Sequence, residues 1–165
     1  MNSIFLQNEL KKLATDFRAG IEEAKYNCIF GHSLLANFPK GCCGIASELL
    51  GQFLLCNGFN CQVVYGVYYF DSFEDVDCCS CGGHSWLKFG ELYIDITADQ
   101  FINDSYFRDC KEYIEPVYVG ETNSFFNSFD IQSVENYVGF VNDDREQEFR
   151  YSEFYNNICK EINKL

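Results

Sequence analysis

The chain has 165 residues, of which 47% are hydrophobic and 18% aromatic, so it can bury a core and is not a disordered segment. Its formal net charge of −13 argues against a nucleic-acid binder, because phosphate contacts need clustered Lys and Arg. The same charge would attract a basic substrate or partner. The alternative interpretation is that it only keeps the protein soluble.

The N-terminal twenty residues predict no signal peptide, because Glu9, Asp16 and several lysines interrupt any apolar run. No apolar stretch approaches the roughly 20 residues that span a bilayer, so no membrane contact is expected. The ten cysteines are interpreted as mostly reduced thiols of a reducing compartment. We therefore expect a cytoplasmic protein, with delivery as an effector as the alternative, and the sequence leaves the oligomeric state undefined.

The first half of the chain predicts two helices and a strand. Apolar residues at helical spacing predict helices from Ser3 to about Lys25 and from Cys43 to about Cys56, the second stopped by Asn57-Gly58. The stretch from Cys61 to Phe70 is rich in Val and Tyr and is typical of a buried strand.

The middle of the chain predicts a loop followed by a β-hairpin. Asp71 to Gly83 is acidic and rich in cysteine, and is expected to be a loop. His84–Phe89 and Leu92–Thr97 are expected to be short strands joined at Gly90-Glu91, because Gly at the first central position suits a type II′ turn.

The remainder predicts a strand at Pro116–Val119, a short helix at Asp130–Phe140 and a terminal helix at Arg145–Lys164. Helices followed by a run of strands are typical of the α+β class. Because no linker divides the chain, we expect one domain over residues 1–165, with a core at about 38–120 and the terminal helices packed around it.

A two-residue turn at Gly90-Glu91 would fix the register of the hairpin. It pairs Phe89 with Leu92, Leu87 with Ile94, Trp86 with Asp95 and His84 with Thr97. Because side chains alternate across a strand, His84, Trp86 and Asp95 share one face, and the apolar residues of the other face form core. Diagonal neighbours lie roughly 7–8 Å apart at the backbone, so a His84–Asp95 hydrogen bond is feasible.

Cysteine at a helix start, with histidine and aspartate nearby, suits thiol chemistry. A helix N-terminus and a neighbouring imidazole both lower a thiol pKa, and the free backbone N–H groups there can hold an oxyanion. Cys43 is the preferred nucleophile over Cys42, because it sits deeper in the helix start and Gly44 allows close substrate approach. His84 would share the thiol proton and Asp95 would orient the imidazole ring.

Several alternatives remain open at this point. His32 is the only other histidine, and Asp99 has the same parity along the strand as Asp95. Trp86 is expected to wall the cleft or to shield the His–Asp pair, and Cys42 and Gly44 are expected to contact the substrate.

The cysteine-rich loop raises the alternative of a zinc site, and its acidic residues could form a rim that attracts basic groups. Cys78, Cys79, Cys81 and His84 form a compact set, although a fourth ligand of a CxxC-type site would have to come from elsewhere. We favour no metal, because zinc would consume His84.

These motifs resemble the transglutaminase-like branch of the papain-type cysteine fold. That pattern has G-x-C at a helix start, a later H-x-W on a strand and an aspartate on the following strand, often in D-x-T. Here the motifs are Gly41-Cys42-Cys43, His84-Ser85-Trp86 and Asp95-Ile96-Thr97, within residues 38–101. The resemblance selects Cys43 and implies a helix bearing the cysteine, packed on an antiparallel sheet that carries the histidine and the aspartate. Cys42 and the cysteine-rich loop depart from the pattern.

The resemblance implies an enzyme that cleaves or transfers amide or isopeptide bonds through Cys43, His84 and Asp95, with no cofactor. Water would resolve a thioester by hydrolysis or deamidation, and an amine would give cross-linking. The expected partner is a protein or peptide substrate, with a basic one as an option. A non-catalytic protein-binding module and a zinc-stabilised interaction domain are the alternative functions.

Overall fold

The computed structural model describes residues 3–70, 80–140 and 145–165, and it belongs to the α+β class that the sequence predicts. Five strands form one antiparallel sheet in the order β4-β3-β2-β1-β5. The helices are α1 (Ser3–Tyr26), α2 (Cys43–Cys56) and α3 (Arg145–Ile162), and the strands are β1 (Gln62–Phe70), β2 (Ser80–Phe89), β3 (Leu92–Asp95), β4 (Tyr118–Gly120) and β5 (Asp130–Asn136). Short 3-10 helices are η1 (Leu34–Asn37), η2 (Ala98–Phe101), η3 (Ser105–Tyr113) and η4 (Phe126–Ser128).

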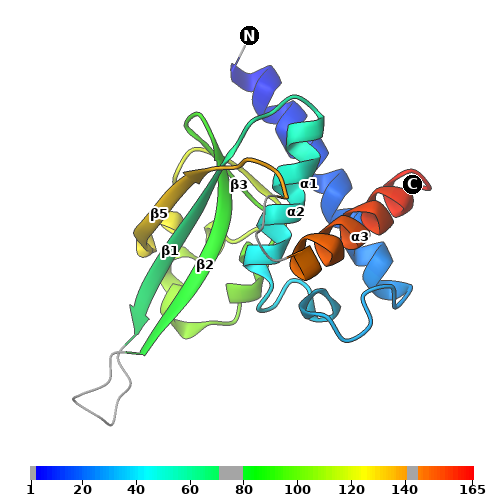
Figure 1. The fold of residues 1–165 in the computed structure, drawn as a ribbon. Helices are drawn as coiled ribbons and strands as arrows, with labels where there is room; N and C mark the ends of the chain where they lie inside the picture. The colour runs from blue at the N-terminus through cyan, green and yellow to red at the C-terminus, as the bar shows by residue number, and fades with distance from the viewer. Residues whose placement is uncertain (1–2, 71–79, 141–144) are drawn as a thin grey trace.

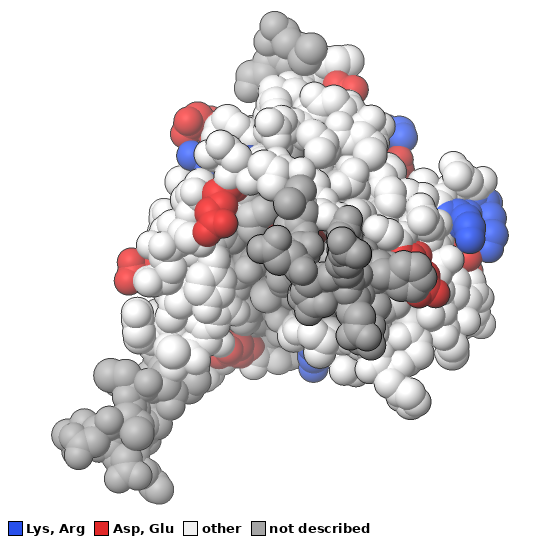
Figure 2. All heavy atoms as spheres, in the orientation of Figure 1, with Lys and Arg blue, Asp and Glu red and all other residues white. Residues whose placement is uncertain are grey.

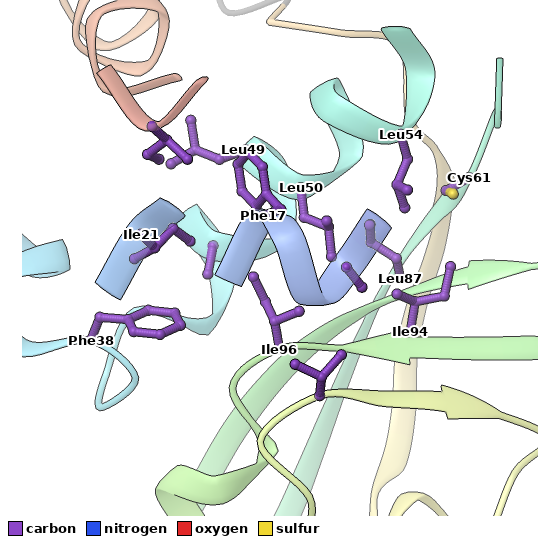
Figure 3. Packing of buried hydrophobic residues seen from close by; sticks show 14 of the residues in the cluster. Phe17, Ile21, Phe38, Leu49, Leu50, Leu54, Cys61, Leu87, Ile94 and Ile96 are labelled. Carbon is purple, nitrogen blue, oxygen red and sulfur yellow. The ribbon is translucent and has the colours of Figure 1, made fainter. Parts of the chain in front are cut away.

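The sheet separates two apolar cores. The three α-helices lie together on one side of it (Figure 1). Side chains such as Phe17, Leu50 and Ile94 from α1, α2 and β3 meet between the helices and the sheet (Figure 3). On the other face, residues from η2 to Phe129 pack an aromatic cluster against Trp86. Both faces of β2 are therefore covered around His84, which is how this strand can hold polar groups away from water.

The predicted hairpin register is confirmed next to the turn. Phe89 pairs with Leu92 and Leu87 with Ile94, and Gly90 adopts the positive φ of 58° that a type II′ turn places at its first central residue. The predicted pairs of Trp86 with Asp95 and of His84 with Thr97 do not form, because the β2–β3 ladder ends at Leu87–Ile94. The face assignment still holds, since Leu87 and Ile94 join the helix-side core and Trp86 joins the aromatic cluster.

Two other sequence predictions are wrong, and a third has shifted bounds. The segment predicted as a helix at Asp130–Phe140 forms the edge strand β5 over Asp130–Asn136. Residues 80–83, predicted as loop, are the first part of β2, and the strand predicted at Pro116–Val119 lies at Tyr118–Gly120. The remainder of the predicted loop, 71–79, lies outside the described residues. Along the described residues, no helix has the length and apolar composition needed to cross a membrane.

The strand pair β1–β2 depends on a glycine opposite His84. Gly66 pairs with His84, and a Cβ at Gly66 would lie 2.8 Å from Phe129 Cβ and 2.9 Å from the Trp86 ring. We expect Gly66→Ala to lower the free energy of unfolding by about 1–3 kcal/mol, because neither the backbone nor the buried ring can move aside cheaply. Urea unfolding would measure this.

The matched control for this substitution is Gly44→Ala in α2, where an added Cβ meets nothing within 4 Å. There we expect stability to be unchanged or raised by up to about 1 kcal/mol, because Ala is the better helix former. A Gly66→Ala protein as stable as the wild type would contradict the close approach of Trp86.

Candidate active site

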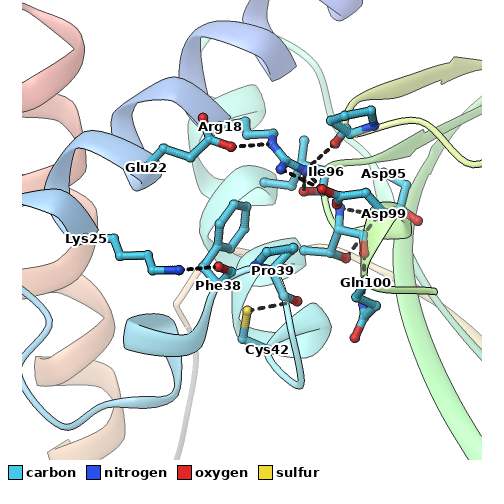
Figure 4. A network of polar contacts seen from close by, with 12 residues as sticks. Arg18, Glu22, Lys25, Phe38, Pro39, Cys42, Asp95, Ile96, Asp99 and Gln100 are labelled. Carbon is cyan, nitrogen blue, oxygen red and sulfur yellow. Dashed lines mark hydrogen bonds and ion pairs between the residues drawn. The ribbon is translucent and has the colours of Figure 1, made fainter. Parts of the chain in front are cut away.

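The two adjacent cysteines at the start of α2 have opposite environments. Cys42 is 2% exposed and its thiol donates to the Pro39 carbonyl at 3.4 Å, so it lies in the helix-side core (Figure 4). Burial, together with the charge of Cys43, raises the pKa of the Cys42 thiol to about 12. Cys42 therefore has no surface to offer a substrate, contrary to the sequence prediction, and it stays protonated.

Cys43, the first residue of α2, is partly exposed and has a lowered pKa. Burial raises the thiol pKa, but hydrogen bonding to His84, the imidazole charge and the backbone of Ser85 together lower it further than burial raises it. The helix N-terminus adds a favourable dipole for a thiolate. Of the two cysteines, only Cys43 combines partial exposure with a lowered thiol pKa.

His84 and Asp95 form a buried pair. His84 Nε2 donates to Asp95 Oδ2 at 2.6 Å, while Oδ1 accepts from the backbone N–H and the hydroxyl of Thr97 at 2.8 and 3.0 Å. Burial alone would lower the pKa of His84, but the charge and hydrogen bond of Asp95 outweigh it and, with Cys43, raise that pKa to about 9. The imidazole is thus held in its charged form at neutral pH.

The second ring nitrogen of His84 completes the arrangement. Because Nε2 faces Asp95, only Nδ1 is left for the thiol, and this buried atom makes no hydrogen bond of standard geometry. The contact with Cys43 is therefore looser than an ordinary hydrogen bond. His84 thus adjoins Cys43 on one side and is bound to the buried carboxylate of Asp95 on the other.

Aromatic rings enclose the imidazole. His84 has no exposed surface, and its ring centroid lies 4.9 Å from Phe101, 5.5 Å from Phe129 and 5.6 Å from Trp86. Aromatic faces stabilise a nearby cation, and here they also keep water from the ring. Trp86 is itself fully buried, so it shields the His84–Asp95 pair and does not form a wall of a cleft.

Two polar side chains fix the segments that carry the three residues. Ser47, one turn after Cys43, donates its hydroxyl to the Ser85 carbonyl at 3.1 Å and so anchors α2 beside His84. Gln100 accepts from the Gly41 N–H at 3.2 Å and donates to the Thr97 carbonyl at 3.0 Å. It therefore joins the loop before the nucleophile to the turn after Asp95.

Arg18 of α1 supports this turn from behind (Figure 4). Its guanidinium binds both carboxylate oxygens of Asp99 at 2.8 Å and donates to the carbonyls of Ile96 and Pro116 at 2.8 and 2.6 Å. The ring of Phe38 lies 5.1 Å from its central carbon. Asp99 is thus engaged by Arg18 and is not the partner of His84.

The remaining candidates are His32, Gly44 and the residues of the predicted zinc site and acidic rim. His32 is on an exposed turn, and Gly44 is exposed with open space beside it. Cys81 and His84 lie on opposite faces of β2, since they are three residues apart on a strand, and this geometry disfavours a shared zinc ion. Cys78, Cys79 and the acidic residues of the predicted rim lie outside the described residues, and no group of three or more metal-ligating side chains forms among the residues placed.

Sequence reasoning missed several residues that build the site. Ser47 follows Cys43 at helical spacing, and this could have marked it as a residue of the same helix face. No local signal points to Gln100, Phe125 or Phe129, because tertiary packing of the segment after β3 brings them to Gly41 and His84.

No known protein family matches this chain, and no curated protein and no solved structure is significantly similar to it.

Proposed function

We propose that the protein is a cysteine-dependent acyl-transfer enzyme with a transglutaminase-like, papain-type core. Support comes chiefly from one observation, the polar arrangement in which partly exposed Cys43 adjoins His84 and His84 is bound to Asp95 at 2.6 Å. A lowered thiol pKa beside a raised imidazole pKa favours a thiolate–imidazolium pair, which is the reactive form of such a site.

The proposed reaction has two steps. The Cys43 thiolate attacks an amide carbonyl carbon, and backbone N–H groups of Ser85 and of the first turn of α2 stabilise the oxyanion. The C–N bond then breaks, the leaving amine takes the proton of His84, and a thioester remains on Cys43. Water or a second amine attacks the thioester, its proton passes to His84, and the thiolate leaves.

Selective alkylation tests this function. At pH 6 we expect iodoacetamide to modify Cys43 before the more exposed Cys28 and Cys56, because only a thiolate reacts quickly. Peptide mass spectrometry over time would measure the order, and Cys43→Ala should remove the fast phase while Cys56→Ala keeps it. Labelling that follows exposure instead would contradict the proposal and favour a binding module that has kept the fold.

A further inference from the structure

The helix-side face of β1 and β2 has an exposed strip next to Cys43. Helix α2 covers this face, and Ser47 near its start is hydrogen-bonded to the Ser85 carbonyl. The part of the sheet that α2 covers therefore ends near Ser85. Further along the strands, Val67 pairs with Gly83 and Tyr69 with Cys81. We call Tyr65, Val67, Tyr69, Cys81 and Gly83 the tyrosine strip; Tyr65 is 41% and Tyr69 53% exposed.

The strip begins at the nucleophile. Tyr65 pairs with Ser85, whose backbone contacts the thiol of Cys43. The Tyr65 ring lies across Gly83, where an added Cβ would be 2.5 Å from the phenolic oxygen. The ring therefore packs flat against β2 at Gly83 and exposes its outer face to solvent. Gly83 is two residues from Ser85 along the strand. On the first turn of α2, a Cβ added at Gly44 would meet nothing within 4 Å, so the space beside this glycine is open.

Carboxylates border the strip. On β5, Asp130 pairs with Val67 and Glu135 with Val63, which places both on the same face as Tyr65. Burial and then the charge of Glu135 raise the pKa of the Glu48 carboxyl on α2. Among the ion pairs of the described residues, none involves these three acids.

The wider charge distribution agrees with this border. In Figure 2 the side of the molecule that carries the sheet has several separate red patches and little blue, whereas the largest blue area lies on the opposite side. With a net charge of −13, the molecule as a whole attracts cations. The exposed aromatic faces add local recognition of a cationic side chain.

We propose that the tyrosine strip binds the acyl-donor segment of a polypeptide substrate and selects one with Lys or Arg near the reacting carbonyl. The segment lies extended along β1 and β2. With a rise of about 3.3 Å per residue, the four steps along the strand from Ser85 to Cys81 span about 13 Å, which places the cationic side chain roughly two to four residues from the carbonyl. The cation contacts the rings of Tyr65 and Tyr69 and the carboxylate of Asp130, which pairs with Val67. This inference rests on the proposed function of Cys43.

Two peptide chloromethyl ketones that differ only in Lys or Glu, roughly three residues before the reactive group, test the strip. In both, the Cys43 sulfur bonds the methylene carbon and chloride leaves. Each modification rate is divided by the iodoacetamide rate of the same protein, which removes effects on the thiol itself. We expect the wild type to prefer the Lys probe by at least about tenfold at low salt, and less at high salt, where charges are screened.

Variants locate the preference. Tyr69→Ser and Asp130→Asn should each reduce the Lys preference several-fold, while Tyr113→Ser, at an exposed tyrosine of η3, should retain it. Equal rates for both probes in the wild type, or a full preference in both strip variants, would contradict substrate selection by the tyrosine strip. If iodoacetamide does not select Cys43 at all, the proposed function fails instead, so the two failures are distinguishable.

Discussion

Replacing His84 by Ala should remove the selective reactivity of Cys43. Without the imidazole, burial is the largest influence left on the thiol, and burial raises its pKa. Thiols paired with a cationic histidine typically have pKa values several units below that of a free thiol, although their intrinsic nucleophilicity falls in parallel. We therefore expect alkylation of Cys43 at pH 6 to slow by at least about tenfold, measured by quantitative peptide mass spectrometry.

Asp95→Asn gives a second variant that keeps the shape of the site. Asn can still accept from Thr97, but it removes the negative charge that holds the pKa of His84 at about 9. The pH at which His84 loses its proton should therefore fall, and the upper limb of the pH–alkylation profile should move to lower pH with it. An unchanged profile in both variants would show that His84 does not act on Cys43.

The same pair makes stability depend on pH. The folded pKa of His84 is raised above its ordinary 6.5, so its contribution to stability is complete below that value. As pH rises through about 9 the contribution is lost, and the urea midpoint of the wild type should fall over this range. In Asp95→Asn the fall should begin at lower pH, which separates this effect from general alkaline destabilisation.

Arg18→Met should be among the most destabilising single substitutions in the protein. Arg18 is 8% exposed, and its removal leaves Asp99 and the carbonyls of Ile96 and Pro116 without their donors. Breaking a buried ion pair from one side typically costs about 3–5 kcal/mol, and we expect the lower end of that range because the Asp99 side chain is 22% exposed. Met replaces most of the apolar volume, so the loss reports the polar contacts and not a cavity.

Urea unfolding of Arg18→Met beside Lys12→Ala would measure this loss. Lys12 forms an exposed pair with Asp16 on the same helix, which is worth about 0.3–0.5 kcal/mol at most. The double variant Arg18→Met with Asp99→Asn should recover part of the stability, since the unpaired charge is then removed. Equal midpoints for Arg18→Met and Lys12→Ala would mean that the network around Arg18 is not maintained in solution.

The sequence predicted the part of the site that depends on local rules. The turn at Gly90-Glu91 sets the register, and strict alternation then places His84 and Asp95 on one face of the sheet. The start of α2 at Cys43 follows from apolar spacing after Gly41. These features need only neighbours a few residues apart, so one sequence is enough to predict them.

The wrong predictions have physical reasons as well. In Asp130–Phe140 the apolar residues Ile131, Val134 and Val138 recur at helical spacing, yet pairing with β1 makes this segment an edge strand with largely exposed side chains. Gly82 and Gly83 suggested a loop, but they lie in a strand, where the rings of Tyr68 and Tyr65 pack directly against them. In both cases contacts with a distant strand override the local pattern.

Arg18 and the aromatic enclosure of His84 could not be predicted, because they join residues far apart in the chain. Arg18 acts on carbonyls 78 and 98 positions later. Phe125 and Phe129 reach His84 from the segment that precedes β5. The contacts also show that α1 supports the site directly, although it lies outside the stretch that carries the resemblance.

This order of contacts has a consequence for a chain that is still being synthesised. Cys43 and His84 are made before Pro116, which Arg18 holds, and before Phe129, which packs on the His84 ring. Until Phe129 is available, the imidazole lacks part of its enclosure and the turn after Asp95 lacks its full support. In the growing polypeptide, Cys43 therefore lies beside an incompletely enclosed His84 until the later half of the chain has folded onto the first.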